Sequence, residues 1–241
     1  MQEYKLNESH YLIPDLADGI YDGLLMVGGS LEFEQLLVAY LNGIFPWYNE
    51  GQQIMWFAPI PRLVLFPKKL KIAKSLKLLM KKNIFQYSVD CNFLDVMLQC
   101  KTVARHGEHG SWIHGDIIQA FSDLHEKGLA HSLEIWKDGD LVGGLYGLAL
   151  GNMFCGESMF FKESNASKIA LAALCIELIR RKFKFIDCQQ DTPHMKSMGA
   201  ELLELEEFQN LLEQNKKHAL IGQSWKQDPR PITSDDLMQF T

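Results

Sequence analysis

Residues 132–150 read SLEIWKDGDLVGGLYGLAL, two apolar runs separated by Lys137-Asp138-Gly139-Asp140. An Asp-Gly turn between two such runs is a strong short-range signal for a β-hairpin. Gly151-Asn152 then leads into a further strand-like run, Met153 to Phe160. The sequence therefore predicts three consecutive strands in this region.

The chain downstream changes to helical spacing. Asn165 or Ser167 is expected to open a helix over Lys168 to Lys182, and the short run Phe183 to Gln189 follows as a strand. Strands, a helix and another strand in this order predict an α+β fold around a mixed sheet.

Upstream, two more helices are predicted. Leu31 to Leu41 has helical apolar spacing, with Ser30 as the candidate N-cap and Gly43 near the C-cap. A second helix is expected over Gly115 to Lys127, ending at Gly128. Prolines at 59, 61 and 67 mark a junction. We therefore expect a small N-terminal domain over residues 1–62 and a larger domain over residues 63–241.

Composition narrows the class of protein. The chain has 241 residues, 47% hydrophobic and 22% charged, which is typical of a globular protein. It has no apolar run long enough for a transmembrane helix and no signal-peptide pattern at its start. The five cysteines include no C-x-x-C pair. We expect a cytoplasmic protein with no membrane partner.

The net charge of −6 is unevenly distributed. Residues 68–105 hold 9 Lys and Arg against 2 Asp and Glu, whereas residues 1–67 hold 2 against 8. Lys68 to Lys82 combines apolar residues at helical spacing with seven lysines and no acid. This pattern fits either a solvated helix face or a surface that binds phosphates.

Three polar side chains interrupt strand-like runs: Glu157, Asp187 and Gln189. Strand alternation would place Asp187 and Gln189 on one face, two residues apart. Such groups need partners when buried, so they could simply satisfy buried loops. Alternatively, a carboxylate steered by an amide could accept a proton from an amine nucleophile.

Other motifs are weaker. His106, His109 and His114 flank a Gly-rich loop, but their spacing matches no helix-borne zinc pattern. No G-x-S-x-G, P-loop or dinucleotide-binding motif is present. Trp47, Trp56 and Trp112 are typical of a core, although tryptophan also stacks on unpaired bases.

Several tracts occur in a characteristic order, from Gly43-Ile44-Phe45-Pro46-Trp47 to Ile186-Asp187-Cys188-Gln189. Between them lie Trp56 to Arg62, His131 to Trp136, Phe154 to Phe160 and Asn165 to Lys168. With these tracts the sequence resembles the bacterial leucyl/phenylalanyl-tRNA–protein transferases. The resemblance implies transfer of Leu or Phe, with Met as a further candidate, from aminoacyl-tRNA to proteins bearing N-terminal Arg or Lys. The product is then marked for degradation by the N-degron pathway.

The resemblance also implies a fold and a set of site residues. The larger domain would have the GCN5-related N-acetyltransferase fold. Asp187 and Gln189 would be the catalytic pair, with Glu157 at the aminoacyl site. The expected aminoacyl-adenosine contacts are Trp47, Trp112, Leu145, Phe154 and Leu174, and the expected tRNA phosphate contacts are Lys68, Lys71, Lys74, Lys81 and Lys82. No metal or other cofactor is implied, because the aminoacyl ester is already activated.

Two rival functions fit part of the same sequence. An acyl-CoA-dependent acetyltransferase would cradle pyrophosphate with a Gly-rich loop, but Phe160 to Ser167 contains no glycine. We therefore expect no acetyl-CoA binding. A non-catalytic RNA-binding module would explain the lysines and tryptophans but not Glu157, Asp187 and Gln189.

Overall fold

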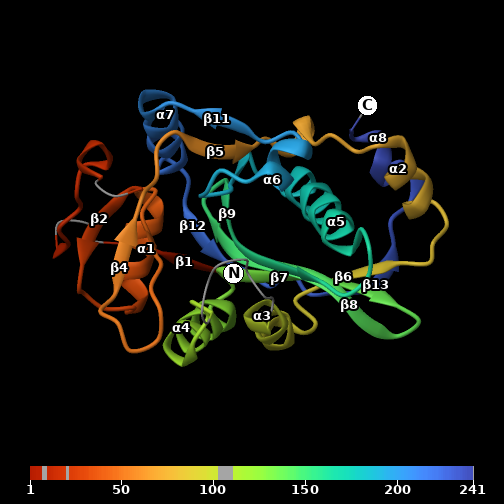
Figure 1. The fold of residues 1–241 in the computed structure, drawn as a ribbon, viewed down its shortest axis with the longest axis horizontal. Helices are drawn as coiled ribbons and strands as arrows, with labels where there is room; N and C mark the ends of the chain where they lie inside the picture. Colours follow the sequence, from red (N-terminus) through yellow and green to blue (C-terminus); the bar gives the residue numbers. More distant parts are fainter. Residues whose placement is uncertain (7–9, 20–21, 103–110, 241) are drawn as a thin grey trace.

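The computed structural model describes residues 1–6, 10–19, 22–102 and 111–240, and its centre is an eight-stranded mixed sheet (Figure 1). In sheet order the strands are β11 (Glu201–Leu203), β5 (Arg62–Leu65), β10 (Phe185–Asp187), β9 (Met153–Phe161), β8 (Asp140–Leu150), β7 (Ala130–Lys137), β6 (Gln86–Val89) and β13 (Gln227–Pro231). Strand β9 runs parallel to β10 and antiparallel to β8. The predicted α+β class with a mixed sheet is confirmed by this topology.

Helices cover both faces of the sheet (Figure 1). Helix α5 (Ala166–Arg180) lies on one face, and α3 (Phe93–Thr102) and α4 (Gly115–Glu126) lie on the other. Twelve of the fifteen residues of α5 are buried, which agrees with its nearly all-round apolar sequence. Two hydrophobic cores result, one on each side of the sheet.

The N-terminal part builds a separate three-stranded sheet of β2 (Leu24–Val27), β4 (Met55–Phe57) and β3 (Phe45–Pro46). Helix α1 (Phe33–Leu41) contributes its buried face to the same core as α3 and α4. The first strand, β1 (Gln2–Tyr4), pairs instead with β12 (Leu220–Gly222) near the C-terminus. The predicted boundary between residues 62 and 63 stays a prediction.

Short elements complete the described chain. They are the 3₁₀ turns η2 (Leu16–Asp18) and η3 (Pro67–Lys69) and the helices α2 (Lys74–Met80), α6 (Pro193–Ser197), α7 (Leu205–Asn215) and α8 (Ser234–Met238). In the part of the chain that the structure describes, no helix is both long enough and apolar enough to cross a membrane.

The predicted hairpin is confirmed. Strands β7 and β8 pair from Ala130↔Leu148 to Lys137↔Asp140. Asp138 and Gly139 both have positive φ, 54° and 89°, as the tight turn between twisted antiparallel strands requires. Helix α4 ends just before Gly128, also as expected.

Three local predictions are wrong. Ser30 does not cap α1, because its hydroxyl donates to Gln35 Oε1 and Glu32 occupies the N-cap position. The lysine-rich segment is not one helix but the turn η3 followed by the short helix α2. The last predicted strand stops at Asp187, because Gln189 has φ 61° and leaves the extended conformation.

Candidate active site

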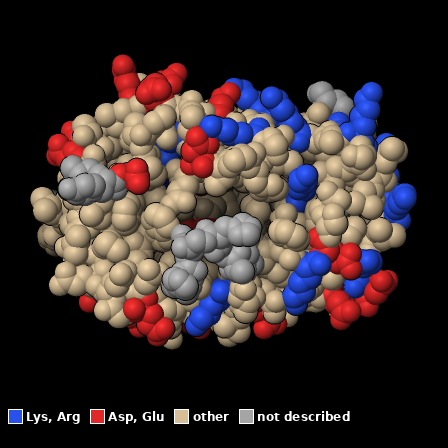
Figure 2. Space-filling view, viewed as in Figure 1, with Lys and Arg blue, Asp and Glu red and all other residues tan. Residues whose placement is uncertain are grey.

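A cavity of about 400 Å³ opens where the parallel strands β9 and β10 part. Their pairing ends at Asp187↔Cys155, and the cavity is lined by the residues that follow on each strand, Gly156 to Met159 and Cys188 to Gln190. Figure 2, viewed from the same side as Figure 1, shows a hollow near the middle of the molecule, in the region where Figure 1 draws β9 and α6. The end of strand pairing therefore creates the space for a ligand.

Glu157 enters this cavity from an irregularity in β9. Tyr146 faces Ser158 and Gly147 faces Gly156, so Glu157 is the extra residue of a β-bulge. A bulge changes the direction of a side chain relative to simple alternation. Strand periodicity alone could not place Glu157, and the bulge explains why this carboxyl group reaches the cavity.

Burial raises the pKa of Glu157 to about 8, and the nearby Asp187 carboxylate adds to the rise. Contacts with the Tyr40 hydroxyl and the Gln189 amide offset part of it. A carboxyl group with this pKa exists in both protonation states near neutral pH, which suits general acid–base chemistry.

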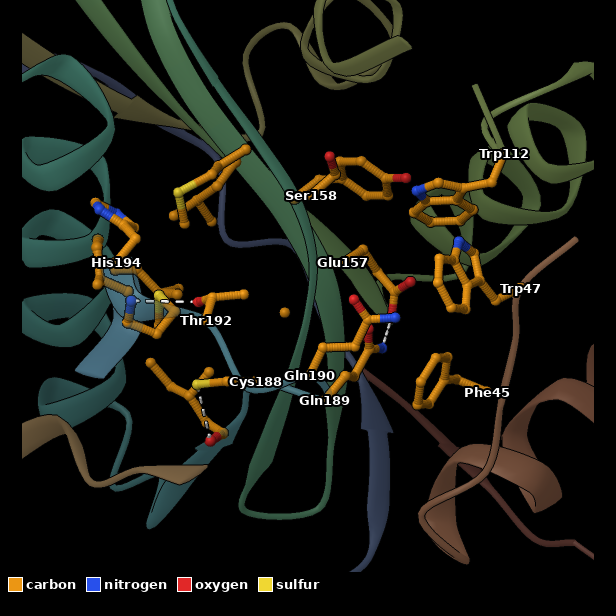
Figure 3. Close-up of a pocket in the computed structure, with 18 of the residues that line it drawn as sticks. Phe45, Trp47, Trp112, Glu157, Ser158, Cys188, Gln189, Gln190, Thr192 and His194 are labelled. Atoms are coloured by element: carbon orange, nitrogen blue, oxygen red, sulfur yellow. Dashed lines mark hydrogen bonds between the residues drawn. The ribbon is translucent and has the colours of Figure 1, made fainter. Parts of the chain in front are cut away.

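Gln189, on the segment that follows β10, holds Glu157. Its Nε2 donates a hydrogen bond to Glu157 Oε1 over 2.9 Å, drawn as a dashed line in Figure 3. Its backbone N–H donates to Asp187 Oδ1 over 2.9 Å. The positive φ of Gln189 allows both contacts, since an extended residue would not turn back in this way.

Asp187 lies outside the cavity lining. Both of its carboxylate oxygens accept hydrogen bonds from Arg62, from Nε over 2.7 Å and from Nη2 over 2.9 Å. The side chains of Arg62 and Asp187 are only 1% and 2% exposed. The expectation that Asp187 and Gln189 share one strand face is wrong, because β10 ends between them. Asp187 contacts Gln189 through the backbone instead.

The two tryptophans expected at the adenosine both line the cavity. Figure 3 draws Trp47 and Trp112 on the same side of the view as Phe45 and Glu157, with His194 and Thr192 on the other side. Trp47 is partly exposed and packs its edge against Phe57, with ring centroids 5.4 Å apart. Trp56, by contrast, is fully buried in the core.

An apolar wall completes the cavity. It includes the expected residues Leu145 of β8 and Leu174 of α5, together with Met159, Leu171 and Ile186. Phe154 is not among the lining residues. It is fully buried on β9 and stacks at 6.3 Å from Trp225.

The five lysines expected to contact tRNA lie along η3 and α2 and the turns beside them. Lys68, Lys71, Lys74, Lys81 and Lys82 are all exposed. Figure 2 shows Lys and Arg side chains gathered over this part of the surface. Leu76 and Met80 bury the opposite face of α2. The segment therefore exposes its lysines to solvent, while the apolar side chains of α2 pack against the core.

Of the three histidines near the Gly-rich loop, His106 and His109 lie outside the described residues. His114 is buried at the start of α4, with its ring 4.7 Å from that of Tyr48. Among the residues that the structure describes, no cluster of three His, Cys, Asp or Glu side chains could hold a metal ion.

Two residues near the site were not singled out from the sequence. Tyr40 of α1 is buried beside Glu157, and burial raises the pKa of its hydroxyl well above the ordinary range. Arg62 opens β5. The run Arg62-Leu63-Val64-Leu65 could have predicted a buried ion pair, because a charge at the start of a buried apolar strand requires a buried partner.

Comparison with known proteins identifies the family. The model of the leucyl/phenylalanyl-tRNA protein transferase matches residues 64–213, and the model of the N-terminal domain of the same family matches residues 29–60. The chain belongs to the leucyl/phenylalanyl-tRNA protein transferase family.

Curated members of this family cover most of the chain. The protein of Desulfatibacillum aliphaticivorans is 46% identical over 226 residues, which span 93% of this chain and 96% of the relative. The protein of Syntrophobacter fumaroxidans is 49% identical, over 85% of this chain and 88% of its own length. The protein of Flavobacterium johnsoniae is 45% identical, over 83% and 94%.

Solved structures are more distant. A GCN5-related N-acetyltransferase from Kribbella flavida is 11% identical and has a TM-score of 0.35, covering 69% of this chain and 59% of its own. L-PGS from Bacillus licheniformis is 10% identical with a TM-score of 0.38, covering 76% and 62%. Both TM-scores are below 0.5, so the fold class rests on the sheet topology described above.

Proposed function

We propose that this transferase joins Leu or Phe, carried by aminoacyl-tRNA, to the α-amine of an acceptor protein with N-terminal Arg or Lys. The observation that carries the proposal is the Glu157–Gln189 pair, which lies in a cavity that also has two tryptophans and an apolar wall. Transfer from tRNA to protein is the activity of the family. The reaction takes place in the cytoplasm and marks its product for degradation.

The chemistry requires one proton transfer at the attacking amine. The neutral α-amine attacks the ester carbonyl carbon, the new N–C bond forms, and the amine loses a proton to Glu157. The bond between the carbonyl carbon and the ribose oxygen then breaks. That oxygen takes the proton from Glu157, which returns to its carboxylate form. Glu157 fits the role of acceptor because its pKa is close to that of an N-terminal amine.

Asp187 has a different part in this proposal. Both of its oxygens already accept hydrogen bonds from Arg62, and it does not line the cavity. Its contact with the reaction is indirect, through the backbone of Gln189. Gln189 is therefore the group that orients Glu157, and Asp187 supports Gln189.

The donor is expected to bind in two parts. Trp47 and Trp112 would stack on the terminal adenine, because aromatic faces bind unpaired bases. The wall that includes Leu145 and Leu174 would take the apolar side chain of the amino acid. The lysines of η3 and α2 would contact phosphates farther along the tRNA.

An acyl-CoA donor is disfavoured by the backbone between β9 and α5. The N–H groups of Lys162 and Glu163 both donate to Val142 O, and the N–H of Ala166 donates to Glu163 O. Glu163 adds a negative charge, partly offset by Lys137 at 3.2 Å. Amide groups engaged in this way do not present a cradle for a pyrophosphate.

Binding of donor analogues tests this assignment. A nonhydrolysable leucyl- or phenylalanyl-adenosine analogue should bind and inhibit transfer, and Trp112→Ala should weaken its binding by about 1–3 kcal/mol. Trp136→Phe is a control, because Trp136 does not line the cavity. Acetyl-CoA binding that displaces the analogue, or acetyl transfer to an Arg-initiated peptide, would contradict the proposal.

A further inference from the structure

Arg62 is a buried cation with contacts to three distant segments. Besides its two bonds to Asp187, its Nη2 donates to Gly43 O over 2.8 Å. Its guanidinium carbon lies 5.1 Å from the ring centroid of Phe45 and 4.9 Å from that of Phe208. Two aromatic rings and a carbonyl oxygen thus fix the position of the group that holds Asp187.

A buried Arg–Asp pair is an inefficient way to stabilise a fold. Burying a charged pair requires desolvation of both ions, and apolar residues of similar size often stabilise a fold equally well. The two parallel bonds between a guanidinium and a carboxylate, however, fix orientation as well as distance. A buried Arg–Asp fork is therefore well suited to holding the carboxylate in one orientation.

The Asp187 orientation matters because Oδ1 has two donors. It accepts from Arg62 Nε and also from the backbone N–H of Gln189. That second bond supports the positive φ of Gln189, which places its side-chain amide 2.9 Å from Glu157. A continuous series of contacts therefore runs from Arg62 to the carboxyl group in the cavity.

We propose that Arg62 is a positioning residue for transfer: by holding Asp187 in a two-bond fork, it fixes the backbone of Gln189 and so the orientation of Glu157. The proposal rests on the proposed function, in which Glu157 accepts the proton from the attacking amine. Arg62 itself touches neither donor nor acceptor.

The test is a double-mutant cycle measured on kcat. Arg62→Lys keeps the charge but loses the fork, so kcat at saturating leucyl-tRNA and Arg-initiated peptide should fall about 10–100-fold, the size of effect that small misplacement causes. Binding of the leucyl-adenosine analogue should stay within about threefold. The cycle uses Arg62→Gln, Asp187→Asn and the double variant, which lacks both charges. The kcat of the double variant should resemble that of Asp187→Asn alone, because the two residues act through one contact.

Arg230→Gln is the matched control. Arg230 also pairs with a buried carboxylate, that of Asp236, within a separate cluster that includes Tyr87. This variant should lower the melting temperature and leave kcat within about twofold. The positioning role would be overturned if Arg62→Lys kept the wild-type kcat. It would also be overturned if the loss of kcat in the Arg62→Gln/Asp187→Asn variant equalled the product of the losses in the two single variants. Failure of the wild-type protein to transfer would instead overturn the proposed function.

Discussion

At the scale of single residues, the site depends on one carboxyl group with an unusual environment. Glu157 is half-buried, lies near the Asp187 carboxylate and the Tyr40 hydroxyl, and accepts a hydrogen bond from Gln189. Its raised pKa lets it accept a proton near neutral pH, where an ordinary glutamate would be too weak a base. In the proposed mechanism the buried Asp187, which the sequence suggested as the base, instead supports Gln189 through the hydrogen bond from its backbone N–H.

Glu157→Gln tests this assignment. The variant keeps size and polarity but loses the basic oxygen, so transfer should fall by about 10²–10⁴-fold while analogue binding stays close to normal. A loss below about threefold would make Glu157 a structural residue.

The pH dependence of kcat/KM for the acceptor peptide gives an independent check of the same variant. In the wild-type protein both Glu157 and the acceptor amine must lose protons, so log(kcat/KM) should rise with a slope of about 2 below pH 7. Glu157→Gln leaves only the amine to titrate, so the slope should be about 1. Equal slopes in the two proteins would contradict the role of Glu157.

At the scale of elements, regular patterns were predictable and departures from them were not. The Asp-Gly turn identified the β7–β8 hairpin, and apolar spacing identified α1 and α5. The bulge at Glu157 and the left-handed Gln189 escaped prediction because each depends on pairing with a neighbouring strand rather than on local sequence. The lysine-rich segment has helical spacing but folds as a turn and a short helix, although its basic and exposed character was visible from composition.

The basic segment gives an element-scale prediction. Replacing Lys74, Lys81 and Lys82 with Ala should weaken tRNA binding and flatten its salt dependence, by a slope of up to about 0.9 for each phosphate that the variant no longer neutralises. The control replaces Lys5, Lys217 and Lys226, which are also exposed but lie outside residues 68–82. If both triple variants keep the wild-type slope, the lysines of η3 and α2 form only a solvated surface.

At the scale of the whole molecule, the site is assembled from segments far apart in the sequence. Phe45 and Trp47 come from the N-terminal part, Trp112 precedes α4, and Glu157 lies on β9. The resemblance of ordered tracts identified most of these residues. It did not reveal that Arg62 connects Gly43 and α7 to Asp187, since long-range contacts of this kind appear only in the folded chain.

The most direct measurement is transfer itself. Purified protein is incubated with leucyl-tRNA or phenylalanyl-tRNA and a peptide with N-terminal Arg, and the products are analysed by mass spectrometry. Matched peptides with an acetylated Arg or with N-terminal Gly serve as controls. We predict one Leu or Phe added through a peptide bond to the α-amine of the Arg peptide only, with equal release of deacylated tRNA. No addition from either aminoacyl-tRNA, or equal addition to the Gly peptide, would contradict the account.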